Sequence, residues 1–365
     1  MPPTKPNINT LNGLSQYAGF RSFYAFSNQL TFPNFDSWLY VLRCKQQEKI
    51  TEENIQFIQS KLSHEYFVFY FIDIVTHFMT QKNKVVCVKL FEIKLDSLEK
   101  SEQLRIAVAL GVILRHSYKD DREFIFSLLD SPQFRRVVVY NFIDYSHFNA
   151  GYMELIKRSI QLETGDDHLL FLHLLSSYHS FLNGQVINDL GSFGQLDFSV
   201  MHPIVHGRYY AYKLYSAPAS KRTAVFDKLL VKSEDLDKCE FFFEIIPTIL
   251  LLNRLDWVER IYNSYYEEIF EVNEFNQITH LSIYQIALTF LSIKEGHLDR
   301  ARSELEKVNF DLALDSYTDY IKLFSFIASY HLEKDKEAVK EEYTQLAEKL
   351  GFKVFILDLL ETYFV

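Results

Sequence analysis

The sequence predicts an all-α protein built as an α-solenoid of stacked helical hairpins. Among 365 residues, glycine (11) and proline (8) are scarce, whereas phenylalanine (33) and tyrosine (23) are abundant. Turn-rich β-sandwiches and glycine-looped α/β enzymes need more glycine and proline, so this composition favours long helices joined by short turns. In addition, a helix, a tight polar turn and a second helix recur between Ile249 and Leu350, most clearly from Leu288 to Val308.

The first 182 residues are expected to form a flexible tail followed by a helical layer. Residues 1–12 contain three prolines and no periodicity, which predicts the tail. Residues 13–182 form the N-terminal helical layer. Within it, Thr51 precedes two glutamates that favour a helix amino terminus, so a helix is expected to run to Leu62.

The segment Val85–Leu95 is the most strand-like in the chain. Its alternation of apolar and polar residues is imperfect, and helical patterns flank it on both sides, so a helix is favoured over a strand. A wide apolar face then predicts a helix from Ser101. Further helices are expected at about residues 122–130, 133–145, 150–162 and 168–182.

Residues 183–202 are predicted to be the connecting segment between two helical layers. The stretch from Asn183 to Pro203 contains three glycines and lacks helical periodicity. We therefore place the main boundary there and assign residues 203–365 to a C-terminal layer of helical repeats.

In this C-terminal layer, the residues that open the second helix of each predicted hairpin lie 34, 43 and 37 residues apart: Ala224, Val258, Ala301 and Ala338. Around Ala301, a leucine (Leu288), a turn glycine (Gly296) and Leu305 follow the pattern of the tetratricopeptide repeat family, whose unit has about 34 residues. Residues 203 to 350 therefore resemble that family.

The resemblance implies that the small residue opening each second helix packs against the preceding helix. Bulkier residues replace the small residue of the family's first helix: Tyr212, Ile246, Thr289 and Phe326. Other residues replace the proline after the second helix: Leu236, Phe270, Ala313 and Leu350.

Charge and cysteine usage limit the class of partner and compartment. Residues 201–365 contain 27 acidic and 19 basic side chains, whereas residues 1–200 contain 21 and 19. An acidic C-terminal half disfavours nucleic acid and membrane surfaces and suits a basic or amphipathic protein partner; the alternative is that the surplus acid only keeps an apolar-rich protein soluble. Three widely spaced cysteines without CxxC spacing predict reduced packing residues in a cytoplasmic protein. No signal peptide or transmembrane segment is expected, because the most apolar run, Phe241–Leu252, is short and contains Glu244 and Pro247.

The histidines give no strong indication of chemistry. His202 and His206 are four residues apart, a spacing that helical zinc sites use. Pro203 between them favours the alternative of a helix start with His202 near the cap. No nucleotide-binding loop, paired-cysteine site or nucleophile motif is present, so we expect no enzymatic activity, no cofactor and no metal.

Basic and aromatic residues alternate from Arg208 to Tyr215, as they do in grooves that bind single-stranded nucleic acid. The alternative is that the tyrosines pack between hairpins while Arg208 and Lys213 face solvent. The surrounding acidic half favours this alternative, so nucleic acid binding is not expected.

The best candidate for a binding surface is an acidic aromatic patch between Tyr262 and Phe275. Stacking rings beside negative charge suit a basic peptide. The candidate partner-binding residues are Tyr262, Tyr265, Tyr266, Glu267, Glu268, Glu271 and Glu274. An ordinary solvated helix face is the alternative for the same residues. The sequence thus predicts a non-enzymatic adaptor or scaffold that binds a protein; the alternative is a regulatory sensor whose repeats bind a peptide or nucleic acid.

Overall fold

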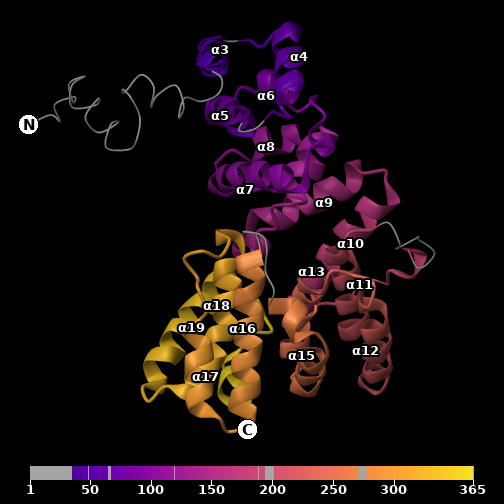
Figure 1. Ribbon diagram of the computed structural model, residues 1–365, viewed down its shortest axis with the longest axis vertical. Helices are drawn as coiled ribbons and strands as arrows, with labels where there is room; N and C mark the ends of the chain where they lie inside the picture. The colour runs from indigo at the N-terminus through magenta and orange to yellow at the C-terminus, as the bar shows by residue number, and fades with distance from the viewer. Residues whose placement is uncertain are drawn as a thin grey trace, which may run out of the picture. The chain divides into compact units, whose positions relative to one another are not determined.

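A computed structural model of the chain describes residues 35–47, 49–64, 67–118, 120–187, 189–193, 201–270 and 277–364. Every regular element in these ranges is helical, and they contain no strand. This confirms the all-α prediction (Figure 1). The predicted tail of residues 1–12 lies outside the described residues.

The chain folds into two compact units, the first ending at Ile113 and the second beginning at Leu114. The helices that begin in the first unit are α3 (Phe35–Gln46), α4 (Glu52–Lys61), α5 (Phe67–Thr80), α6 (Lys84–Leu90), η1 (Leu95–Ser97) and α7 (Lys100–Ser117). Helix α5 is apolar on most of its faces, packs on α3 and α6, and buries most of its apolar side chains.

Two predictions for the first unit are confirmed. Thr51 caps α4: its side chain accepts a hydrogen bond from the backbone N–H of Asn54, whose own side chain accepts one from the N–H of Thr51. The segment Val85–Leu95 forms α6 and a turn, not a strand. Asn83 caps that helix by accepting from the N–H of Val86 at 3.2 Å.

The second unit begins with short and irregular helices. These are α8 (Arg122–Leu128), η2 (Phe134–Val139), η3 (Tyr145–His147), η4 (Phe148–Tyr152), α9 (Met153–Leu162), α10 (Asp166–Leu182) and η5 (Gly191–Phe193). The helix expected at 133–145 is only one π-helical turn, η2. The Asn141 side chain donates to the carbonyl oxygens of Arg136 and Val137, so two carbonyls left free where the turn ends are satisfied.

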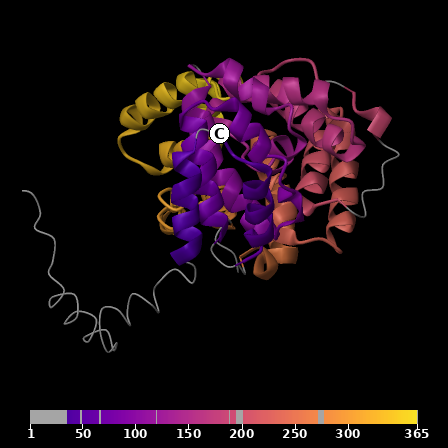
Figure 2. The same ribbon diagram turned by 90° about the horizontal axis from the view of Figure 1, so that it is seen from above.

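Four helical hairpins follow. The first pairs α11 (Pro203–Ser216) with α12 (Ala219–Ser233), and the second pairs the two short helices α13 (Lys238–Phe243) and α14 (Ile246–Leu251) with α15 (Leu255–Phe270). The third pairs α16 (Gln277–Lys294) with α17 (Leu298–Leu305), and the fourth pairs α18 (Asp315–Leu332) with α19 (Lys336–Leu350). Helix α20 (Leu357–Thr362) ends the series. Helices α11 and α12 lie side by side (Figure 2). Consecutive hairpins also touch, because α11 packs on α13, α13 on α16, and α16 on α18.

The predicted boundary at residues 183–202 does not coincide with the division between the two units. Helices α10 and α11 on either side of it pack directly, and the rings of Phe181 and Tyr215 stack at 4.6 Å. The helices on the two sides of this segment are therefore in direct contact.

Proline and the repeat position also depart from a regular array. Pro247 lies in the first turn of α14. The helix is interrupted between α13 and α14 because proline has no backbone N–H to donate to the helical hydrogen bond. At the aligned repeat position, Val258 and Ala301 are buried, but Ala224 and Ala338 are exposed. The expected packing of this residue against the preceding helix thus differs among the hairpins.

Gly296 makes the turn between α16 and α17 with a φ of +79°, and a Cβ added there would meet nothing within 4 Å. The only penalty of a side chain is therefore backbone strain. We expect Gly296→Ala to lower the free energy of unfolding by about 1–2 kcal/mol, measured by urea denaturation. Gly296→Asn, which tolerates a positive φ better, should lose less. Equal stability of both variants and the native chain would contradict this geometry.

Candidate functional site

The acidic aromatic patch predicted on α15 is divided between the interior and the surface. Tyr262 and Tyr265 are buried, with 6% and 8% of their surface exposed. The hydroxyl of Tyr262 donates to the carbonyl oxygen of Tyr284 at 2.6 Å, and that of Tyr265 donates to Glu234 at 2.8 Å. These two rings therefore anchor α15 to its neighbours and present no surface to a partner.

Three of the predicted residues are accessible. Tyr266 is 48% exposed, and its ring lies 4.6 Å from that of Phe270. Glu267 and Glu268 beside it are exposed. We call these three residues the α15 acidic face. Glu271 and Glu274 lie outside the described residues.

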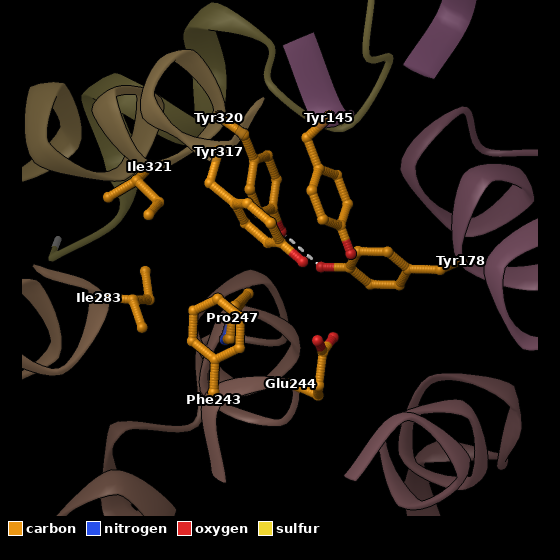
Figure 3. A pocket seen from close by; sticks show the side chains of 9 residues that line it. All are labelled: Tyr145, Tyr178, Phe243, Glu244, Pro247, Ile283, Tyr317, Tyr320 and Ile321. Atoms are coloured by element: carbon orange, nitrogen blue, oxygen red, sulfur yellow. Dashed lines mark hydrogen bonds between the residues drawn. The ribbon is translucent and has the colours of Figure 1, made fainter. Parts of the chain in front are cut away.

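A buried ion pair joins α11 to the segment that follows α13. Arg208 on α11 donates to Glu244, which follows α13, with 2.7 Å between Nη2 and Oε1. Arg208 Nη1 also donates to the Tyr145 hydroxyl at 3.3 Å, and both charged residues are less than a tenth exposed. The break at Pro247 places Glu244 between two short helices, where its carboxylate points into the interior (Figure 3).

Gly207 allows this pair to form. A Cβ at Gly207 would lie 2.3 Å from the carbonyl oxygen of Phe241, too close for any side chain. Helix α11 therefore approaches α13 at a distance that only glycine permits, which brings Arg208 within reach of Glu244.

Four tyrosines lie on the side of Glu244 to which its carboxylate points. The hydroxyl groups of Tyr145, Tyr178, Tyr317 and Tyr320 gather above it, and Tyr178 and Tyr320 share a hydrogen bond (Figure 3). The rings of Tyr145 and Tyr320 stack at 4.6 Å. We call the ion pair and these rings the tyrosine centre.

The tyrosine centre lines a cavity too small for a substrate. The space open to the centre of a water molecule is about 10 Å³, which holds about one water. Known ligand pockets have volumes of about 300–1,000 Å³. In this conformation the centre can hold helices together, but it offers no room for a reaction.

Burial sets the ionisation of the pair. It raises the pKa of Glu244, and the attraction of Arg208 opposes this rise without cancelling it. Burial works to lower the pKa of Arg208, but Glu244 and the neighbouring tyrosines Tyr145 and Tyr317 together outweigh it, and the pKa rises. Arg208 therefore keeps its charge, and on acidification Glu244 is the member of the pair that takes up a proton.

A cysteine and a histidine meet in the same unit but do not form an activated nucleophile. Cys239 Sγ and His280 Nδ1 are 3.7 Å apart, and both residues are buried. Burial raises the pKa of Cys239 to about 12 and, together with the charge of His202, lowers the pKa of His280 to about 3. Both groups are neutral at physiological pH, whereas a catalytic thiol needs its thiolate form.

His202 and His206, which have the spacing of a helical zinc site, lie at a helix start. His202 caps α11, accepting from the N–H of Ile204 at 3.3 Å with Pro203 in the first turn, as the alternative interpretation predicted. Its Nε2 lies 3.3 Å from Glu240, while His206 is buried. Among the described residues, no three His, Cys, Asp or Glu side chains gather as metal ligands would.

The stretch on α11 that resembles a nucleic-acid-binding groove does not expose Arg208. Tyr212 and Tyr215 are buried, in agreement with the packing alternative. Arg208, which that alternative placed in solvent, is buried against Glu244, and this part of the prediction is wrong. A guanidinium that is already paired in the interior cannot contact phosphate.

Two further buried acids, Asp144 and Glu163, were not predicted from the sequence. Asp144 accepts from Arg115 Nε at 3.2 Å and lies 3.1 Å from His147 Nδ1. Glu163 accepts from Arg136 and the N–H of Thr164; although burial opposes ionisation, these hydrogen bonds lower the pKa of Glu163 to about 2. Both acids tie irregular segments of the second unit together.

One signal could have revealed the tyrosine centre. Glu244 interrupts the most apolar run of the chain, and a charge in such a run is usually paired when the run is buried. Arg208 is also surrounded by rings and apolar residues. The sequence does not show that these two charges meet.

Comparison with family models, with curated proteins and with solved structures finds no match to the chain. None of the helices in the described part of the chain is long and apolar enough to cross a membrane. The three cysteines are unpaired and buried, as predicted.

The ion pair can be tested by a double-mutant cycle. Glu244→Leu leaves Arg208 charged and buried without its carboxylate partner, so the free energy of unfolding should fall by about 3–5 kcal/mol. Arg208→Met is the second single variant of the cycle. The double variant Arg208→Met with Glu244→Leu should lose less than Glu244→Leu alone, as measured by urea denaturation. Additive losses would show that the two charges do not interact.

The neutral state of His280 predicts an acid-dependent stability. Because its folded pKa of about 3 lies below the unfolded value of 6.5, only the unfolded chain binds a proton between these pH values. Stability conferred by neutral His280 is therefore complete above pH 6.5 and falls as the pH is lowered toward 3. His280→Phe should reduce the pH dependence of the unfolding free energy by about 1 kcal/mol per pH unit. An unchanged slope between about pH 4.5 and 6.5 would contradict a buried neutral imidazole.

Proposed function

We propose that the chain is a non-enzymatic adaptor that holds a protein partner on a surface of tetratricopeptide-like helical repeats. The stacking of hairpins supports this proposal, because each hairpin from α11 to α19 packs on the next. Arrays of this kind present extended surfaces formed by many helices, and such surfaces bind other macromolecules. The buried neutral thiol and the small tyrosine centre give no support to catalysis.

The observation that carries the proposal is the α15 acidic face. An aromatic ring that is nearly half exposed lies beside two exposed carboxylates on one helix. A lysine or arginine of a partner can stack on Tyr266 while pairing with Glu267 or Glu268. A basic segment is therefore the partner chemistry that this face fits, and the reduced cysteines favour a cytoplasmic setting.

We expect the triple variant Tyr266→Ala, Glu267→Gln, Glu268→Gln to lose a partner that the native chain captures in stoichiometric amount. With that partner purified, the dissociation constant should rise at least tenfold, about 1.4 kcal/mol, in a titration followed by calorimetry. Affinity for the native chain should also weaken as salt is added, because exposed charges are screened.

A matched control is Glu337→Gln with Glu341→Gln, which removes two exposed charges from α19. This control should bind as the native chain does. If the α15 triple variant binds the partner with unchanged affinity, the α15 acidic face is not the binding surface.

A further inference from the structure

The chain turns back on itself after α19. Gly351 ends that helix with a φ of +69°, and residues 352–364, here called the C-terminal segment, then run over helices of earlier hairpins. The Phe352 ring lies 6.1 Å from that of Tyr320, and the Phe355 ring lies 5.2 Å from that of Phe324. The N–H of Val354 donates to the carbonyl oxygen of Leu182 at 3.0 Å.

The end of the C-terminal segment reaches two other helices. The Tyr363 hydroxyl donates to the carbonyl oxygen of Leu250 at 2.6 Å, and the Asn253 side chain donates to the Tyr363 carbonyl at 3.1 Å. The Phe364 ring lies 5.2 Å from Phe290 and 4.9 Å from His331. One short segment thus contacts the three helices α14, α16 and α18, together with the turn after α14.

These contacts define a surface that we call the inner groove. It consists of Leu250, Asn253, Phe290, Tyr320, Phe324 and His331. The groove is built from residues of separate hairpins, so it exists only where those hairpins stack.

The inner groove holds the C-terminal segment as a binding site holds a peptide. His331 Nε2 lies 3.0 Å from the carbonyl oxygen of Leu360, and the Tyr343 hydroxyl donates to that of Ile356 at 3.3 Å. Side chains of the body therefore bind backbone carbonyls of the segment, as Asn253 also does. Apolar anchors fill the groove on one side, while Ile356 on the other side is 54% exposed.

Two properties favour release of the segment. Gly351 ends α19 in the left-handed conformation, and glycine can change its backbone conformation there at less cost than other residues. The helix of the segment, α20, has six residues, whereas isolated helices need about 12–15 to be even marginally stable. This helix therefore depends on docking for its stability.

We propose that the inner groove is a peptide-binding site that the chain's own C-terminal segment occupies, and that a partner's segment of the same chemistry binds there by displacing it. That ligand is a short amphipathic helix with aromatic residues before and after it. An acidic residue in its last turn takes the place of Glu361, which pairs with Lys340 at 2.6 Å. This site is separate from the α15 acidic face and stands whether or not that face binds anything.

Because the C-terminal segment occupies the inner groove, it lowers the apparent affinity of a competing peptide. A competitor binds only the fraction of molecules whose groove is open, so its apparent dissociation constant is the intrinsic constant divided by that fraction. With about one molecule in a hundred open, binding is about 100-fold weaker than to an empty groove. Variants that release the segment should therefore bind a free peptide more tightly.

The first experiment is hydrogen exchange on the full chain, followed by mass spectrometry. If the C-terminal segment opens independently, the amides of residues 352–364 exchange faster than those of α16 and α18. Exchange of the segment at the same rate as α16 and α18, in one cooperative step, overturns the proposal because the segment is then part of the core.

The second experiment is a fluorescence titration with a labelled peptide of residues 351–364. The full chain with Phe355→Ala and Tyr363→Ala should bind this peptide at least tenfold more tightly than the native chain. The control variant Ile356→Ala with Leu357→Ala changes the two outward-facing residues and should bind as the native chain does. A scrambled peptide should not bind either variant.

Failure to bind the peptide, in a double variant whose segment exchanges freely and whose body still melts cooperatively, overturns the proposal. If that variant does not fold, hydrogen exchange on the native chain decides whether the segment opens independently. Neither measurement involves the α15 acidic face, so failure here and failure of the proposed adaptor function are distinguishable.

Discussion

The buried ion pair of Arg208 and Glu244 is the interaction on which the second unit depends. Charges taken out of water cost several kcal/mol each unless they meet with good geometry. Meeting requires α11 to lie against α13 at the separation that Gly207 permits, since a Cβ there would collide with Phe241. Electrostatics and steric exclusion thus select the same register between two neighbouring hairpins.

The tyrosine centre also fixes the position of helix α18 relative to the ion pair. Tyr320 on α18 stacks on Tyr145, and the same ring contacts Phe352 of the C-terminal segment. One side chain therefore belongs both to the buried centre and to the inner groove. Packing that fixes α18 against the ion pair also shapes the surface on which the C-terminal segment lies.

Local features of the fold could be predicted from the sequence, and non-local ones could not. Thr51 and the His202–Pro203 pair start helices through contacts within three residues, so their roles can be inferred without the fold. Arg208 and Glu244 lie 36 residues apart, and nothing local distinguishes a paired arginine from a solvated one. Tyr262 and Tyr266 likewise share one helix, but only the packing of α16 decides which ring is covered.

The C-terminal segment shows why a repeat alignment stops short of the binding surface. The alignment detects helices long enough to show periodicity, and the six residues of α20 are too few to do so. That helix forms because groove side chains and aromatic contacts stabilise it, which is tertiary information. The short length of α20 makes it hard to predict from the sequence, and it also makes the segment displaceable. A longer helix would be easier to predict and would be stable alone, but its folding would not be coupled to occupation of the groove.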